Sequence, residues 1–210
     1  MRMIICVLAV IVKVFSKVPS PEERDELIAE LTKLREDVQP DASNMNLVSY
    51  SEKMGLIADK WVSRCIPDYP SHYSNPEFGD YGFIFSKYPG LPQFKDALIT
   101  AAKKDAYNFT RNFCTGTCRY YKQAVSAKST KVGCAKQYCD NNGLGLVACA
   151  FNSAERVRGG RPYDCGPSCS KCPHDYSCVH RQCSSMSPES DRTKSALSTT
   201  LTMLILYSCN

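Results

Sequence analysis

The fold is decided by residues 118–151, CRYYKQAVSAKSTKVGCAKQYCDNNGLGLVACAF. Residues 118–127 favour a short helix. The apolar runs at 131–135 and 144–151 are typical of buried strands, and Asp140-Asn141-Asn142-Gly143 before the second run is typical of a turn. This stretch predicts a helix followed by two strands within a mixed α+β domain.

Further helical patterns precede this stretch, over residues 20–38, 50–65 and 93–107. The first begins with Ser20-Pro21-Glu22-Glu23, which predicts a capping box. The second carries Trp61, the single tryptophan of the chain, on its apolar stripe, so we expect Trp61 to pack in the core. Residues 66–95 are rich in Pro, Tyr, Ser and Gly and predict a long loop.

The composition excludes several classes of protein. The 210 residues are 43% hydrophobic and 22% charged, an ordinary globular balance that excludes general disorder. No stretch reaches the roughly 18 to 20 apolar residues that a membrane-spanning helix needs. The net charge of +5 is modest, so we expect no nucleic-acid partner. The 13 cysteines are informative, because a secreted protein would carry them as disulfides.

Both ends of the chain carry targeting patterns. Arg2, followed by an apolar run up to Val12, predicts a signal peptide over residues 1–16 that is cut before Lys17. Residues 184–210 combine small serines, a polar spacer and a moderately apolar tail, which is the layout of a glycolipid-anchor signal. A disordered or short amphipathic tail is the alternative. We therefore expect a secreted, extracellular protein that contacts a membrane only if the tail signals an anchor.

Five cysteines gather near the end of the chain, at Cys165, Cys169, Cys172, Cys178 and Cys183. Almost no aliphatic residue lies between them, so this segment must be held together by cross-links rather than by an apolar core. Disulfides are favoured in an oxidising compartment. The alternative is a zinc site built from the last four of these cysteines.

A series of motifs follows the chain in order: residues 34–45, 57–65, 107–109 with Cys114, 118–125, 132–135, 147–151 and 159–163 leading into 169–172. Together they resemble the CAP superfamily, which includes cysteine-rich secretory proteins, insect venom antigens and plant pathogenesis-related proteins. The resemblance covers about residues 27–183. The apolar tail and overall style look like the venom-allergen-like proteins of parasitic worms.

The resemblance implies a three-layer α-β-α sandwich over residues 17–163 and a small C-terminal cysteine-rich hinge over 164–183. It implies the main-domain disulfides Cys65–Cys139, Cys114–Cys118 and Cys134–Cys149. It assigns the hinge bridges to Cys169, Cys172, Cys178 and Cys183. Cys165 is left over, and it is free, pairs with another chain, or reaches Cys209.

Many CAP domains carry a cleft with two histidines and two glutamates that can hold a divalent metal. By position, His72 matches the first histidine, and Asp80 stands near the place of the first glutamate. Lys103 occupies the place of the second glutamate and Tyr120 that of the second histidine. Because a lysine repels a metal ion, we expect a degenerate cleft with no metal, no cofactor and no catalytic residue.

The resemblance therefore implies a non-enzymatic protein that acts by binding a lipid or sterol, or a host or other extracellular protein. Two alternatives stay open: a hydrolase-like activity that uses His72, and binding of anionic glycans by the basic residues within 119–136. Asn108-Phe109-Thr110 is the single N-glycosylation motif of the chain, so we expect a glycan on Asn108.

Overall fold

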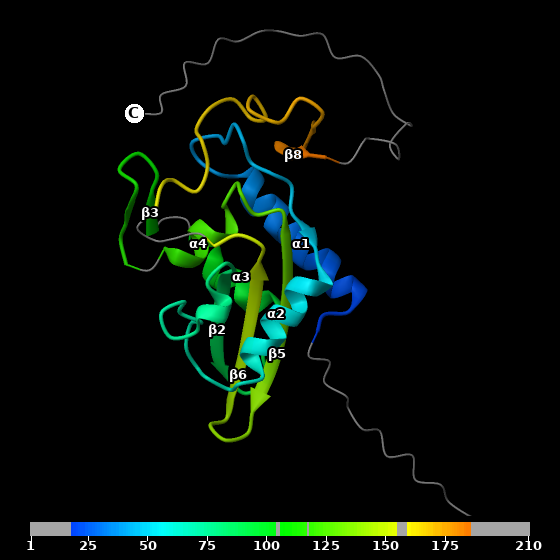
Figure 1. The fold of residues 1–210 in the computed structure, drawn as a ribbon, viewed down its shortest axis with the longest axis vertical. Coiled ribbons are helices and arrows are strands. Elements are labelled where there is room, and N and C mark those ends of the chain that lie inside the picture. The colour runs from blue at the N-terminus through cyan, green and yellow to red at the C-terminus, as the bar shows by residue number, and fades with distance from the viewer. Residues whose placement is uncertain (1–17, 104–105, 117, 155–158, 186–210) are drawn as a thin grey trace, which may run out of the picture.

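The computed structural model describes residues 18–103, 106–116, 118–154 and 159–185 (Figure 1). Its helical elements are α1 (Pro21–Glu36), α2 (Glu52–Val62), the 3-10 turn η1 (Pro76–Phe78), α3 (Lys95–Ala101) and α4 (Arg119–Ala124). Its strands are β1 (Ser49–Tyr50), β2 (Gly82–Pro89), β3 (Tyr107–Asn108), β4 (Phe113–Cys114), β5 (Lys131–Cys139), β6 (Leu144–Phe151), β7 (Ser177–Val179) and β8 (Gln182–Ser184). Within the described ranges, no helix is long and apolar enough to cross a membrane.

The central sheet has the strand order β1-β5-β6-β2. β5 and β6 form an antiparallel hairpin, β2 pairs antiparallel with β6, and β1 pairs parallel with β5. The predicted strand at 144–151 is confirmed as β6, whereas β5 continues to Cys139 instead of ending at 135. β5 is longer because every residue up to Cys139 finds a partner on β6.

The prediction of a loop over residues 66–95 is wrong for β2. The run Gly82-Phe83-Ile84-Phe85 is buried and pairs with β6 over its whole length. Turn-forming residues on both sides of this run concealed a strand that pairing with a distant partner stabilises.

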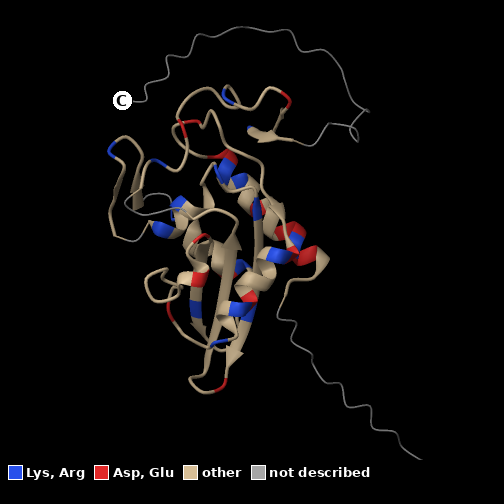
Figure 2. Ribbon diagram, viewed as in Figure 1, with Lys and Arg blue, Asp and Glu red and all other residues tan. Residues whose placement is uncertain are grey.

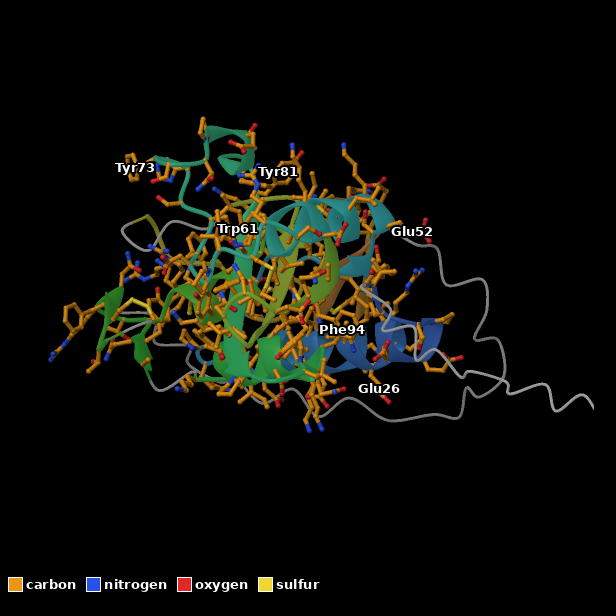
Figure 3. All side chains as sticks on the ribbon, turned by 90° about the horizontal axis from the view of Figure 1, so that it is seen from below. Glu26, Glu52, Trp61, Tyr73, Tyr81 and Phe94 are labelled. Carbon is orange, nitrogen blue, oxygen red and sulfur yellow. A yellow bond between two sulfur atoms is a disulfide. The ribbon has the colours of Figure 1, made fainter. Side chains whose placement is uncertain are left out.

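Alternation along the strands builds a three-layer sandwich. Phe83 and Phe85 enter the core cluster beneath α2, and Ile84 enters the cluster that contains residues of α1, α3 and α4. Side chains of successive strand residues point to opposite faces of a sheet, so both faces of this sheet are buried. Figure 3 shows α2 on one side of the sheet and α1 with α3 on the other. The α-β-α fold expected from the family resemblance is confirmed.

The helices form for the reasons that the sequence indicated, with shorter bounds. Ser20 and Glu23 cap α1 reciprocally, because the Glu23 N–H donates to the Ser20 hydroxyl and the Ser20 N–H donates to the Glu23 carboxylate. α3 ends at Ala101 rather than near 107. Trp61 is 1% exposed in the core, and its indole N–H donates to the Asp68 carbonyl at 3.1 Å.

Disulfides cross-link both the sandwich and the segment that follows it. The bonds in the sandwich are Cys65–Cys139, Cys114–Cys118 and Cys134–Cys149, which are the pairs that the resemblance implied. In the hinge, Cys169 bonds Cys178 and Cys172 bonds Cys183, so these four sulfurs are unavailable as zinc ligands. Cys165 is also disulfide-bonded, which excludes the free thiol. The alternative that named Cys209 lies outside the described residues.

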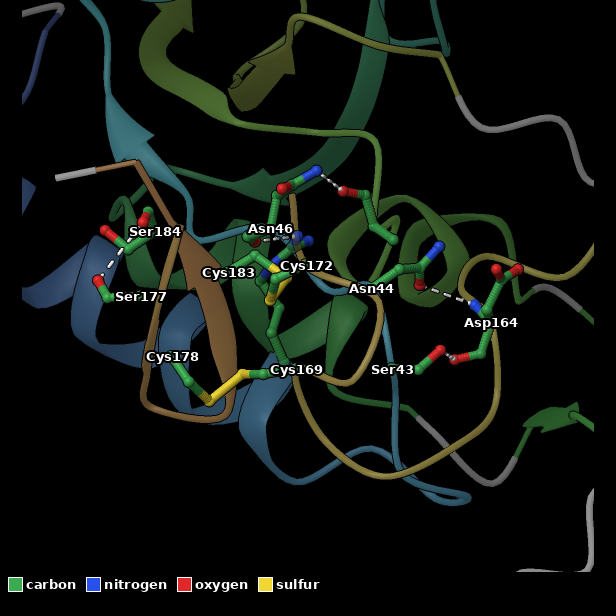
Figure 4. Close-up of a disulfide and its surroundings, with 12 residues drawn as sticks. Ser43, Asn44, Asn46, Asp164, Cys169, Cys172, Ser177, Cys178, Cys183 and Ser184 are labelled. Atoms are coloured by element: carbon green, nitrogen blue, oxygen red, sulfur yellow. Dashed lines mark hydrogen bonds between the residues drawn. A yellow bond between two sulfur atoms is a disulfide. The ribbon is translucent and has the colours of Figure 1, made fainter. Parts of the chain in front are cut away.

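The hinge packs along the segment between α1 and β1 (Figure 4). The Cys183 N–H donates to the Met45 carbonyl, and the Leu47 N–H donates to the Cys183 carbonyl at 2.8 Å. Farther along, the Ser43 N–H donates to the Asp164 carbonyl at 2.8 Å. These backbone bonds hold a segment that has little apolar core of its own.

Arg35 of α1 joins the hinge to the sandwich. Its side chain donates to the carbonyls of Asn46, Ala124 and Ser129 and to the side-chain oxygen of Gln182, over 2.7 to 3.3 Å. The side chain is 1% exposed, and burial lowers the pKa of Arg35 to about 9, so the guanidinium stays charged near neutral pH. One buried cation thus binds four separate segments of the chain.

We expect Arg35→Met to lower the free energy of unfolding by at least about 3 kcal/mol, because three carbonyls lose their buried donor. Guanidinium chloride unfolding of the disulfide-bonded protein, followed by Trp61 fluorescence, measures this. Lys33→Met, at an exposed position of the same helix, should stay within about 0.5 kcal/mol of the parent protein. Equal losses in the two variants would contradict the role given to Arg35.

Candidate functional site

Two tyrosines face each other beside the edge strand of the sheet. Tyr120 is the second residue of α4, and Tyr69 lies in the loop between α2 and η1. Their ring centroids are 6.1 Å apart. Two adjoining pockets of about 490 Å³ each share Asp68 and Tyr69 in their walls. We refer to these two pockets together as the tyrosine cleft.

Local sequence explains why Tyr69 takes this place. It stands in Pro67-Asp68-Tyr69-Pro70, where two prolines restrict the backbone. The Tyr69 ring packs edge-on against Phe83 of β2, at 6.5 Å between centroids. The loop is also tied to β2 by Lys87, whose ammonium donates to the Pro67 carbonyl at 3.0 Å.

The tyrosine cleft keeps its phenols neutral near physiological pH. Burial raises the pKa of Tyr120 to about 12, and burial also raises the pKa of Tyr69. The Arg119 guanidinium lies 4.2 Å from the centroid of the Tyr69 ring, and its charge lowers both pKa values without reversing the shifts. A neutral phenol both donates and accepts hydrogen bonds, so Tyr120 can bind either kind of ligand group.

The structure does not bring His72, Lys103 and Tyr120 into one cleft. His72 is exposed, and its ring lies 3.9 Å from that of Tyr73, which is 87% exposed. Figure 3 shows Tyr73 at the outer end of its loop, away from the sheet. Lys103 is exposed after α3, and Asp80 is exposed before β2. Of these four residues, only Tyr120 lines the tyrosine cleft.

Tyr69 and Thr100 are among the cleft residues that the sequence analysis did not identify. Thr100 of α3 lies in the same pocket wall as Tyr120, and its hydroxyl is 3.0 Å from that of Ser86. The two prolines that flank Tyr69 were the one signal in the sequence that this tyrosine has a fixed position. Without β2, however, nothing indicated which edge of the sheet this loop would cover.

A second site is the groove between α1 and α3, of about 610 Å³. Its apolar lining includes Leu27, Phe94, Leu98 and Ile99, and its rim carries Glu23, Glu26, Glu30 and Lys95. Ile99 is 58% exposed. Figure 3 shows Phe94 and Glu26 on the side of the sheet opposite Trp61.

The basic residues within 119–136 do not form one face. Lys122 is buried and donates to the Gly160 carbonyl at 3.0 Å, and Lys136 pairs with Glu23 at 3.7 Å. Lys131 of β5 donates to the Ser49 hydroxyl. Figure 2 shows basic and acidic residues interspersed over several elements. The arrangement gives no support to the anionic-glycan alternative.

The sequence profile of the cysteine-rich secretory protein family, CAP, matches residues 28–151. The chain belongs to the CAP family. It is 31% identical to GLIPR1-like protein 1 of Mus musculus over 202 residues, covering 91% of this chain and 84% of that protein. It is 27% identical to peptidase inhibitor 16 of Bos taurus over 175 residues, which is 77% of this chain but 36% of that longer protein.

The fold of this CAP domain also matches solved structures. The venom allergen-like protein 4 of Schistosoma mansoni superimposes with a TM-score of 0.57 at 23% identity, covering 73% of this chain and 100% of that one. This likeness shows a shared fold. Together with the disulfides, family membership is consistent with an extracellular protein.

We expect zinc titration to detect no site that depends on His72. Among the residues described, no three His, Cys, Asp or Glu side chains are grouped to hold a metal ion. Calorimetry on the parent CAP domain, His72→Ala and His174→Ala should give the same heat, because both histidines are exposed. Micromolar binding that only His72→Ala abolishes would show that His72 belongs to a metal site.

Proposed function

We propose that this CAP protein is non-enzymatic and extracellular, and that it binds a sterol in the groove between α1 and α3. The observation that carries the proposal is the groove itself. Its volume of about 610 Å³ lies in the range of small-molecule sites, and Phe94, Leu98 and Ile99 offer apolar surface along α3 and the residue before it. Burial of such surface drives binding of an apolar ligand.

The charges of the rim favour a neutral head group. Glu23, Glu26 and Glu30 face the groove, with Lys95 as the cation in its lining. Lys136 pairs with Glu23 and lies 4.2 Å from the centroid of the Phe94 ring, so the two cations offset two of the three carboxylates. The remaining negative charge repels a fatty-acid carboxylate, whereas a sterol hydroxyl can donate to a glutamate.

No observation in the described residues supports the hydrolase alternative. His72 contacts the ring of Tyr73, and no hydrogen bond in the described residues joins it to a serine or threonine hydroxyl. Nucleophilic catalysis needs a base in hydrogen-bonding reach of the nucleophile. The described geometry is thus in keeping with a binding role.

Exposed Ile99 allows a test that spares the core. We expect Ile99→Glu to weaken binding of radiolabelled cholesterol at least tenfold, because it places a charge in the groove. Leu56→Glu is the matched control, since Leu56 is 67% exposed on α2, across the sheet. It should bind as the parent protein does.

Palmitate should bind more weakly than cholesterol in the same assay. The proposal fails if cholesterol uptake is not saturable, or if the two glutamate variants lose it equally. A preference for palmitate would contradict the proposed selection of a neutral head group, although the groove would remain the proposed binding site.

We also propose that Asn108 carries an N-linked glycan. Asn108 and Thr110 are both exposed around the β3–β4 hairpin, while Phe109 between them is buried. The secreted protein should lose mass on treatment with an N-glycosidase, and Asn108→Gln should abolish that shift. Asn141→Gln, at an exposed asparagine outside any sequon, should retain it. An intact-mass measurement would also test the cut before Lys17 and the anchor signal, which lie outside the described residues.

A further inference from the structure

We propose that the tyrosine cleft binds a neutral saccharide. This inference goes beyond the lipid groove, because the cleft is lined by different residues and offers different chemistry. It combines aromatic surfaces, unpartnered polar groups and charges of both signs.

The aromatic surfaces come from both pockets. Tyr69 lines both pockets and Tyr120 lines one, whereas Trp61, in the wall of the other, is 1% exposed and offers no ring face to a ligand. The apolar C–H face of a sugar ring packs on an aromatic face, and the ring hydroxyls then point toward the pocket rim. Aromatic side chains with a polar end suit a ligand that is apolar on one face and polar at its edge.

Hydrogen-bonding groups surround these surfaces. The Tyr120 hydroxyl has no hydrogen-bond partner among the described residues, although its side chain is half-buried. The hydroxyls of Ser86 and Thr100 bond each other at 3.0 Å in the same wall. Hydroxyls both donate and accept, which matches the hydroxyls of a sugar.

Two charged groups at the cleft have no ion-pair partner in the described residues. Asp68 lines both pockets, and Arg119 lines the pocket that contains Trp61. Arg119 contacts the Tyr69 ring, and neither residue takes part in a salt bridge of the described structure. A carboxylate that accepts and a guanidinium that donates can bind adjacent hydroxyls of one sugar.

The position of Asp68 favours a neutral ligand over an anionic one. The cleft carries two cations, Lys87 and Arg119, and one anion, Asp68, which lines both pockets; the Lys87 ammonium donates to the Pro67 carbonyl. An anionic ligand would be repelled by the Asp68 carboxylate. A purely apolar ligand would remove water from Asp68, Arg119 and Tyr120 and would offer no hydrogen bonds in place of those that these groups make to water. A saccharide replaces those bonds.

The test uses the full secreted protein and a panel of lactose, N-acetyllactosamine, chitobiose and maltose, with a heparin-derived tetrasaccharide as the anionic comparison. Saturation-transfer NMR identifies which sugar binds, and titration of that sugar measures its affinity. We expect at least one neutral sugar to bind with a dissociation constant below about 10 mM. Tyr120→Phe should weaken it about fivefold, as expected for loss of one hydrogen bond, and Arg119→Ala about tenfold or more.

Tyr138→Phe is the control, because Tyr138 is exposed on β5 and lies outside the cleft lining. It should leave binding unchanged. Circular dichroism melting checks that each variant is folded, and Tyr120→Phe, which keeps the ring, remains interpretable if Arg119→Ala does not fold. Absence of saturable binding across the panel overturns the proposal. So does tighter binding of the heparin fragment, or equal loss in Tyr120→Phe and Tyr138→Phe.

Discussion

The buried guanidinium of Arg35 is the interaction on which the arrangement of the domain depends. A charge removed from water must be matched by nearby acceptors, and here they come from residues 46, 124, 129 and 182. These acceptors belong to segments that the sheet does not connect. The requirement to satisfy one cation therefore places the hinge, the end of α4 and the approach to β5 around α1.

The same requirement reaches the tyrosine cleft. Arg35 donates to the carbonyl of Ala124, which is the last residue of α4. Arg119 and Tyr120 are the first two residues of the same six-residue helix. A helix this short has little stability of its own, so its ends must be held by tertiary contacts. Arg35 holds one end, and the disulfide at Cys118 holds the other.

Local signals in the sequence were sufficient for part of the fold. Ser20 and Glu23 cap α1 within four residues of chain, and the apolar run of β6 carries its own burial pattern. β2 was missed because its pairing with β6 joins residues about sixty positions apart, and no local pattern contains that partner. Prediction of the cleft residues was limited in the same way. Tyr120 was identified from a motif, whereas placing Tyr69 required knowledge of the strand that it contacts.

β2 is an edge strand, and edge strands of a sheet need to be covered. The segment 67–70 contacts this strand, with Lys87 bonded to the Pro67 carbonyl and the Phe83 backbone within hydrogen-bonding reach of the Tyr69 hydroxyl. The Tyr69 hydroxyl is thereby committed to the sheet edge, while the Tyr69 ring still lines both pockets of the cleft. Tyr120 approaches the same edge from α4 and has no such backbone partner in the described residues. The two facing phenols are chemically alike, yet the sheet edge occupies the hydroxyl of Tyr69 and leaves the hydroxyl of Tyr120 without a partner in the described residues.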